Sequence, residues 1–195
     1  MIEERFEDPW GRHQEIKKMK KKIWFFMIII LSVTVIWYKV PHYKHRTFEG
    51  LLFQLGAENA QNVQSVEVEI KGFVQWYFFS PMTFKGTIRI EDELLPPPES
   101  PDKELEVKLI GMLNGGQIRY RTDPDDYLKG AYYGILVFNK DFSKMTLLKY
   151  EKHGEGSYSW DVGKSMMISA PATNRTEALS IANELMGTAL PNPLE

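Results

Sequence analysis

The chain has 195 residues, with 24 basic and 26 acidic side chains, so its formal net charge is −2. It contains no cysteine, which excludes a disulfide framework, thiol catalysis, a cysteine zinc site and a lipid-modified cysteine anchor. Its folded part must therefore depend on an ordinary hydrophobic core.

Residues 1–22 are predicted to be a cytoplasmic tail that is too short to fold alone. A basic cluster ends it, and lysines beside an apolar segment attract anionic lipid headgroups at about 1 kcal/mol per residue. The cluster adjoins the apolar block without a spacer, which disfavours nucleic acid as its ligand. We therefore expect the lipid bilayer as partner of Lys17, Lys18, Lys20, Lys21 and Lys22.

Residues 23–38 form the one long block without a charge. As a helix, these sixteen residues span roughly 24 Å, slightly less than the ~30 Å hydrocarbon core of a bilayer. Ser32 and Thr34 can satisfy their hydroxyls on the carbonyl four residues earlier. The sequence predicts a transmembrane signal anchor at 23–40. Lysines and aromatic residues at its two ends would complete the span, namely Lys22, Trp24, Trp37, Tyr38 and Lys39.

Two other interpretations of this block are weaker. A cleaved signal peptide needs small residues after the apolar region, where this chain has Trp37 and Tyr38. A buried helix of a soluble protein rarely has five lysines in six residues at one end and tryptophans at both. Seven basic residues precede the block and three follow it closely, so the N-terminus is predicted to be cytoplasmic and the remainder extracytoplasmic.

The charge is divided unevenly along the chain. Residues 1–46 have 10 basic and 5 acidic side chains, a net of +5, whereas residues 47–195 have 14 and 21, a net of −7. An acidic exterior segment does not favour nucleic acid as a partner. A cysteine-free exported domain behind a short cytoplasmic tail indicates a bacterial plasma-membrane protein.

Residues 41–62 are predicted to be a juxtamembrane collar with a short helix at 47–55. In this stretch Phe48, Leu51, Leu52 and Leu55 recur at helical spacing, and Thr47 is a candidate N-cap. The domain proper is expected at 63–187.

An aromatic stretch at 73–84 follows the alternating strand 66–70. As one continuous strand it would be apolar on both faces, which predicts either a central strand covered on both sides or an exposed binding surface. The candidate partner surface consists of Trp76, Tyr77, Phe78 and Phe79.

The later elements are mostly strands and turns. Strands are predicted at 84–90 and 166–169, hairpins at 105–121 and 132–150, a stiff proline loop at 94–102 and a hairpin loop at 153–160. A C-terminal amphipathic helix should start at an Asn174 N-cap, with Glu177 three residues later, and stop at Gly187. Residues 188–195 are expected to be a loose tail.

The predicted fold class is therefore α+β, with a membrane helix, an extracytoplasmic antiparallel sheet and a C-terminal helix. No motif indicates a cofactor, a metal or a catalytic site. The favoured function is a non-enzymatic binding or regulatory domain whose partner is another membrane or cell-surface protein. The alternative is an anchored hydrolase with a site assembled from His153, Ser157 and Asp161.

Overall fold

The computed structural model describes residues 9–76, 81–110, 115–126, 129–153, 157–161, 165–187, 190 and 192–195, and gives the backbone alone for 9–18 and 37–39. The chain divides into two compact units, Met1–Val40 and Pro41–Glu195.

The described part of the first unit is one helix, α1 (Pro9–Lys39). It includes residues 9–22, which the sequence assigned to a cytoplasmic tail too short to fold alone. Proline suits the first helical position, and the Glu, Gln, Lys and Arg that follow are good helix formers. As predicted, the hydroxyls of Ser32 and Thr34 donate to the carbonyls of Ile28 and Ile30, both at 2.8 Å. Among the described residues, no helix combines the length and apolarity needed to cross a membrane.

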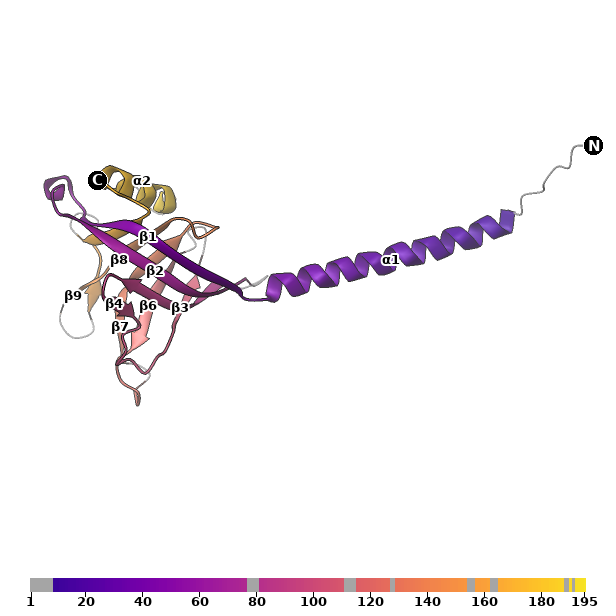
Figure 1. The fold of residues 1–195 in the computed structure, drawn as a ribbon, viewed down its shortest axis with the longest axis horizontal. Coiled ribbons are helices and arrows are strands. Elements are labelled where there is room, and N and C mark those ends of the chain that lie inside the picture. The colour runs from indigo at the N-terminus through magenta and orange to yellow at the C-terminus, as the bar shows by residue number, and fades with distance from the viewer. Residues whose placement is uncertain are drawn as a thin grey trace, which may run out of the picture. The chain divides into compact units, whose positions relative to one another are not determined.

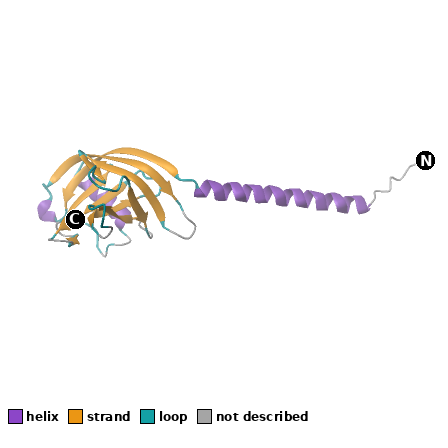
Figure 2. Ribbon diagram, turned by 90° about the horizontal axis from the view of Figure 1, so that it is seen from below, coloured by secondary structure: helices purple, strands orange, loops and turns teal. Residues whose placement is uncertain are grey.

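In the described part of the second unit, nine strands form one antiparallel sheet, in the order β4-β3-β2-β1-β11-β8-β7-β6, with β5 also paired to β3. The strand β5 lies against β6 as well, and Ile110 N–H donates to Gly115 C=O at 2.8 Å. The sheet therefore curls back towards its own start as a half-barrel (Figures 1 and 2). The strands are β1 (His42–Gln54), β2 (Val63–Gln75), β3 (Met82–Ile90), β4 (Glu93–Leu95), β5 (Leu105–Leu109), β6 (Gly115–Arg121), β7 (Gly130–Phe138), β8 (Met145–Lys149) and β11 (Met166–Ala170). A 3₁₀ turn, η1 (Ala57–Asn59), joins β1 to β2, and β9 (Glu151–Lys152) pairs with β10 (Tyr158–Ser159) as a separate hairpin.

The apolar residues form two clusters, one on each face of the sheet. The inner cluster fills the curl with side chains such as Phe84, Phe138 and Leu147, all at most 1% exposed. The outer cluster lies beneath α2 (Arg175–Met186), which packs on β1, β11, β8 and β7 (Figure 1). The predicted α+β class, with an antiparallel sheet and a C-terminal helix, is thus confirmed.

The short helix predicted at 47–55 is wrong, because residues 47–54 belong to β1. The inner face of β1 carries Phe48 and Leu52, its outer face carries Leu51 and Phe53, and Leu55 joins the outer cluster just after the strand ends. Two apolar faces of a strand produce the same spacings as one face of a helix, so periodicity could not separate the two structures.

The continuous strand predicted at 73–84 is also wrong. Strand β2 ends at Gln75 and β3 begins at Met82. The two strands pair with Val74 opposite Phe84, so the aromatic stretch includes the connection of a hairpin. The strands predicted at 66–70, 84–90 and 166–169 lie within β2, β3 and β11, and the hairpin predicted at 132–150 is formed by β7 and β8. The hairpin predicted at 105–121 is not a regular one, because β5 pairs with β3 and, among the described residues, a single bridge from Ile110 to Gly115 leads to β6. The proline loop predicted at 94–102 begins inside β4, which ends at Leu95.

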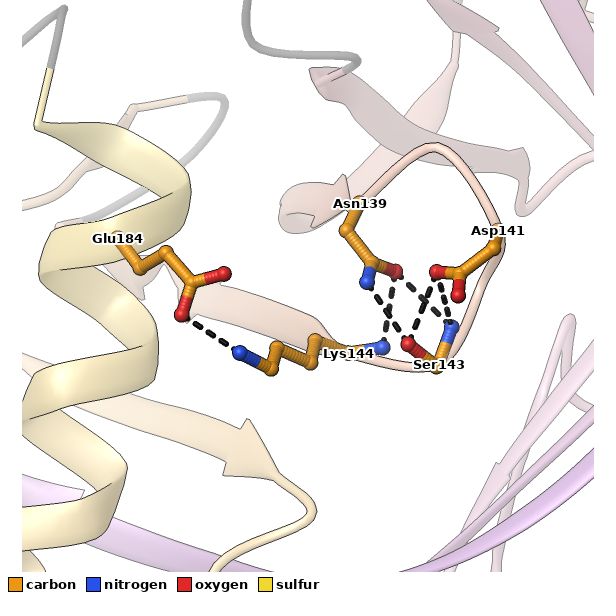
Figure 3. A network of polar contacts seen from close by, with 5 residues as sticks. All are labelled: Asn139, Asp141, Ser143, Lys144 and Glu184. Atoms are coloured by element: carbon orange, nitrogen blue, oxygen red, sulfur yellow. Dashed lines mark hydrogen bonds and ion pairs between the residues drawn. The ribbon is translucent and has the colours of Figure 1, made fainter.

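The connection between β7 and β8 is fixed by its own side chains (Figure 3). The Asn139 amide oxygen accepts from the N–H groups of Ser143 and Lys144, both at 2.9 Å. The hydroxyl of Ser143, at 2.8 Å, and its N–H lower the pKa of the Asp141 carboxyl. Lys144 Nζ lies 2.6 Å from a carboxylate oxygen of Glu184, which joins this turn to α2. The turn therefore helps to set the position of the helix on the sheet.

The N-cap predicted for the C-terminal helix is confirmed. The Asn174 side-chain oxygen accepts from the Glu177 N–H at 3.0 Å. The Glu177 carboxylate bonds the N–H and hydroxyl of Thr173, both at 2.9 Å, and these donors lower its pKa. This return bond reaches the residue before the N-cap, one position earlier than in a standard capping box.

The end of the chain is not the loose tail that was expected. Leu194 is only 3% exposed and belongs to the outer cluster. The Asn183 amide accepts from its N–H at 2.7 Å and donates to its C=O at 3.1 Å, and Gly56 N–H donates to the carbonyl of Glu195 at 2.9 Å. These bonds are long-range, so a local pattern could not reveal them.

Candidate binding surface

On β1 the outer cluster beneath α2 includes Leu51 and Phe53, and from Tyr43 the outer face continues across the neighbouring strands β2 and β3. Strand alternation places polar side chains here, as in Glu67, Glu69 and Lys71 of β2. One row across the sheet departs from this pattern, because Tyr43 pairs with Phe73, Phe73 with Lys85, and Lys85 with Glu106 of β5. An aromatic pair thus occupies positions where solvent-facing polar residues are expected.

The two rings remain largely accessible. Tyr43 is 58% exposed and Phe73 is 49% exposed, although their ring centroids are 5.3 Å apart with an interplanar angle of 60°. Cross-strand contact therefore covers only part of each ring. Scattered apolar residues on a surface are ordinary, whereas a contacting aromatic pair beside a hollow marks a candidate contact surface.

A hollow of about 420 Å³ adjoins the pair. The ring of Phe73 and the Pro41 side chain supply apolar atoms, and Lys85 and Glu104 supply charged groups. Lys85 Nζ also lies 3.0 Å from a carboxylate oxygen of Glu106. The hollow is mainly apolar with a charged rim, which is the composition of a site for an apolar side chain with polar neighbours.

A charged cluster lies farther along the same face. One Glu69 oxygen is 2.7 Å from Lys71 Nζ and 2.9 Å from His45 Nε2, and the other is 3.7 Å from Arg89 Nε. The hydrogen bonds from Lys71 and then from His45 hold the pKa of the Glu69 carboxyl below its usual range. Glu69 is thus a fixed carboxylate at neutral pH, unsuited to general acid catalysis and able to give the surface a polar border.

Trp76 is the one member of the predicted partner surface that the structure describes. It is half-buried against the inner cluster, and its ring centroid lies 5.1 Å from that of His42 in an edge-to-face arrangement. Trp76 therefore contributes to packing more than to an open surface. The other three predicted residues, Tyr77, Phe78 and Phe79, lie outside the described residues.

The sequence prediction missed both exposed rings. Phe73 could have been found by extending the alternation of 66–70, because it falls on the polar face with Glu67 and Glu69. Tyr43 could not, because β1 was not recognised as a strand and its partner in β2 follows only from the register.

The residues of the predicted hydrolase site are all exposed. His153 and Ser157 belong to one hairpin, joined by a 2.8 Å bond from the His153 N–H to the Ser157 C=O. The Asp161 main chain bonds instead with Ser165. An exposed hairpin of this kind provides little desolvation for a nucleophile and its base. Within the described residues, no group of three or more His, Cys, Asp or Glu side chains could hold a metal ion.

The predicted anchor residues lie on α1. Lys22 and Trp24 are exposed, and the side chains of Trp37, Tyr38 and Lys39 lie outside the described ones. Comparison with protein-family models, curated proteins and solved structures finds no match for the chain.

Proposed function

We propose that this chain is a single-pass membrane protein of a bacterial plasma membrane, and that its extracytoplasmic sheet domain binds a partner protein through the surface of Tyr43 and Phe73. The role is binding or regulation without catalysis. The observation that carries this proposal is the exposed aromatic pair beside an apolar hollow, next to the polar side chains Glu69 and Lys71 of β2.

Burial of the Phe73 ring would provide useful binding energy. A phenylalanine side chain buries roughly 150–250 Å², so its 49% exposed part amounts to about 100 Å² and about 2.5 kcal/mol at 25 cal/mol per Å². This is the size of a hot-spot contribution, for which aromatic residues surrounded by polar groups are typical. The Lys85–Glu106 pair would then define the orientation of the partner more than its affinity.

The membrane anchor rests on the sequence, namely on the uncharged block at 23–38 and the lysines before it. The last two residues of this block are among those whose side chains the structure does not describe. The excess of basic residues before the block supports a cytoplasmic N-terminus. The proposed partner is a protein because a segment with a net charge of −7 does not attract nucleic acid or an anionic lipid surface.

The topology can be tested with single cysteines, because the chain has none of its own. Lys103→Cys is suitable for the outer domain, since Lys103 is exposed, and His13→Cys reports on the tail. A membrane-impermeant maleimide applied to intact bacteria should label only Lys103→Cys. Labelling of His13→Cys alone would show that the orientation is the reverse of the one proposed. If both cysteines were labelled only after cell lysis, the sheet domain would not be extracytoplasmic.

The binding surface can be tested by photo-crosslinking in the native membrane. A photoreactive phenylalanine at Tyr43 should form a covalent adduct with one protein, whereas the same group at the exposed Asp92 should not. Adding Phe73→Ser should abolish the adduct. An adduct that persists with Phe73→Ser, or the absence of any adduct at Tyr43, would contradict the proposal.

A further inference from the structure

A second hollow lies on the outer face of the sheet, at β6, β7 and β8. It has a volume of about 240 Å³ and is lined by Gln117, Tyr132, Tyr150 and Tyr158. Gln117 lies on β6 and Tyr132 on the neighbouring β7, Tyr150 directly follows β8, and Tyr158 comes from the separate β9–β10 hairpin. The Tyr43–Phe73 surface lies on β1 and β2, so the two sites share no residue.

The tyrosines are arranged as ring surfaces with polar ends. The rings of Tyr132 and Tyr158 meet edge to face with centroids 5.6 Å apart. The Arg119 guanidinium lies over the Tyr132 ring, 5.4 Å from its centroid. A Cβ at Gly130 would be 2.8 Å from Arg119 Nε, so glycine gives this guanidinium its space beside β7. Gln117 and the Tyr150 hydroxyl are within a long hydrogen bond of 3.5 Å.

The lining defines the chemistry of a ligand. The lining contains no carboxylate, ammonium or guanidinium group, so the hollow itself offers an ion no oppositely charged partner. Phenol hydroxyls and the glutamine amide can each donate and accept hydrogen bonds, so the accessible lining is mainly polar, and the rings add a smaller apolar part. A ligand that matches both properties has hydroxyls around its edge and C–H groups on its faces.

We infer that this hollow, formed by Gln117, Tyr132, Tyr150 and Tyr158 and called here the tyrosine pocket, binds a neutral saccharide unit. At about 30 Å³ per water, its volume corresponds to roughly eight waters, enough for one sugar ring. One ring face would contact Tyr158 or Tyr132, and the hydroxyls would replace water on Gln117 and Tyr150. The tyrosines are half-buried, which limits the side-chain entropy lost on binding.

Saturation-transfer NMR on the full chain tests this inference. The detergent must be free of sugar, such as dodecylphosphocholine, because a maltoside headgroup would compete. The probes are chitotetraose and maltotetraose, with inorganic phosphate as an anionic comparison titrated by calorimetry. We expect saturation transfer to the ring C–H groups of at least one oligosaccharide, and no binding of phosphate.

Two variants localise the binding. Tyr158→Ala removes a ring from a two-residue strand of the hairpin, and Gln117→Ala removes the exposed amide. Each should raise the saccharide Kd at least tenfold, whereas Tyr43→Ala, the matched tyrosine variant on the other surface, should leave it unchanged. The far-UV circular dichroism of all three should equal that of the native chain.

The inference is overturned if neither oligosaccharide shows transfer, if phosphate binds and saccharides do not, or if Tyr43→Ala weakens binding as much as Tyr158→Ala. Failure to observe the Tyr43 photo-adduct would contradict the proposed partner surface but not the saccharide site, because the two sites are tested with different probes and different variants.

Discussion

Leu194→Ala should destabilise the sheet domain although it lies next to the end of the chain. Leu194 is 3% exposed in the cluster between α2 and the sheet. A Leu→Ala change in a core costs about 2–5 kcal/mol, and the exposed neighbours Pro193 and Glu195 allow the backbone to relax into part of the vacated space. We therefore expect a loss at the lower end, about 2–3 kcal/mol. For a unit of this size that corresponds to a decrease in Tm of about 4–12 °C.

Urea unfolding of the full chain, followed by far-UV circular dichroism and tryptophan fluorescence, measures this loss. Trp160 is partly buried against the same cluster, so its emission responds to the region of interest. Pro193→Ala is the matched control, because Pro193 is exposed and should change the free energy of unfolding by less than about 0.5 kcal/mol.

A double-mutant cycle with Asn183→Ala identifies the cause. Asn183 bonds only the backbone of Leu194 among the contacts described, so either single change should weaken the same docking of the chain end. The two losses should add to more than the loss in the double variant. A Leu194→Ala effect equal to that of Pro193→Ala, or strict additivity in the cycle, would refute the view that this end is docked.

Two further changes test the close approach of β2 and β3 and the ion pair between Asp102 and Arg121. Gly86→Ala should cost about 1–3 kcal/mol by thermal unfolding, because a Cβ there would overlap the Lys71 carbonyl oxygen on β2. Thr87→Ala, at the next position of β3, is the control, and equal losses would contradict the close approach. Asp102→Asn should cost about 1.5–3 kcal/mol at pH 7, because Asp102 accepts from the N–H and Nε of Arg121, both at 2.7 Å. Burial alone would raise the Asp102 pKa, but these donors outweigh it and lower the pKa. The bonds of Asp102 therefore stabilise the fold at any pH above its pKa in the unfolded chain, about 3.9. This stabilisation is lost as the pH falls through the lower pKa of the folded chain. Urea titrations should show the difference between native chain and variant shrinking below about pH 4, and a difference that grows there would reverse the sign of the argument.

The outer face of the sheet has three distinct regions. Helix α2 covers β1, β11, β8 and β7, the Tyr43–Phe73 surface lies to one side of it on β1 to β3, and the tyrosine pocket lies on β6 to β8. The inner face, in contrast, is filled by side chains of the inner cluster. Both proposed binding sites therefore lie on the outer surface, and the curled interior serves stability.

The sequence alone was sufficient to predict those elements that are marked by a pattern within a few residues. Val66, Val68 and Ile70 alternate with charged residues, and they lie on the inner face of β2. Asn174 and Glu177 mark the start of α2 through side-chain bonds to nearby backbone groups. Both signals act over a few residues, so the sequence by itself determined the α+β class, the strand at 66–70 and the final helix.

The tertiary structure decided what depends on partners distant in the chain. β1 resembles a helix in sequence because α2 and the inner cluster make it apolar on both faces. Tyr43 and Phe73 are separated by almost the whole β1–β2 hairpin, and only the register brings their rings together. The docking of Leu194 on Asn183 and the tyrosine pocket arise in the same way, since burial and cross-strand contact are properties of the assembled sheet and are not encoded in any local spacing.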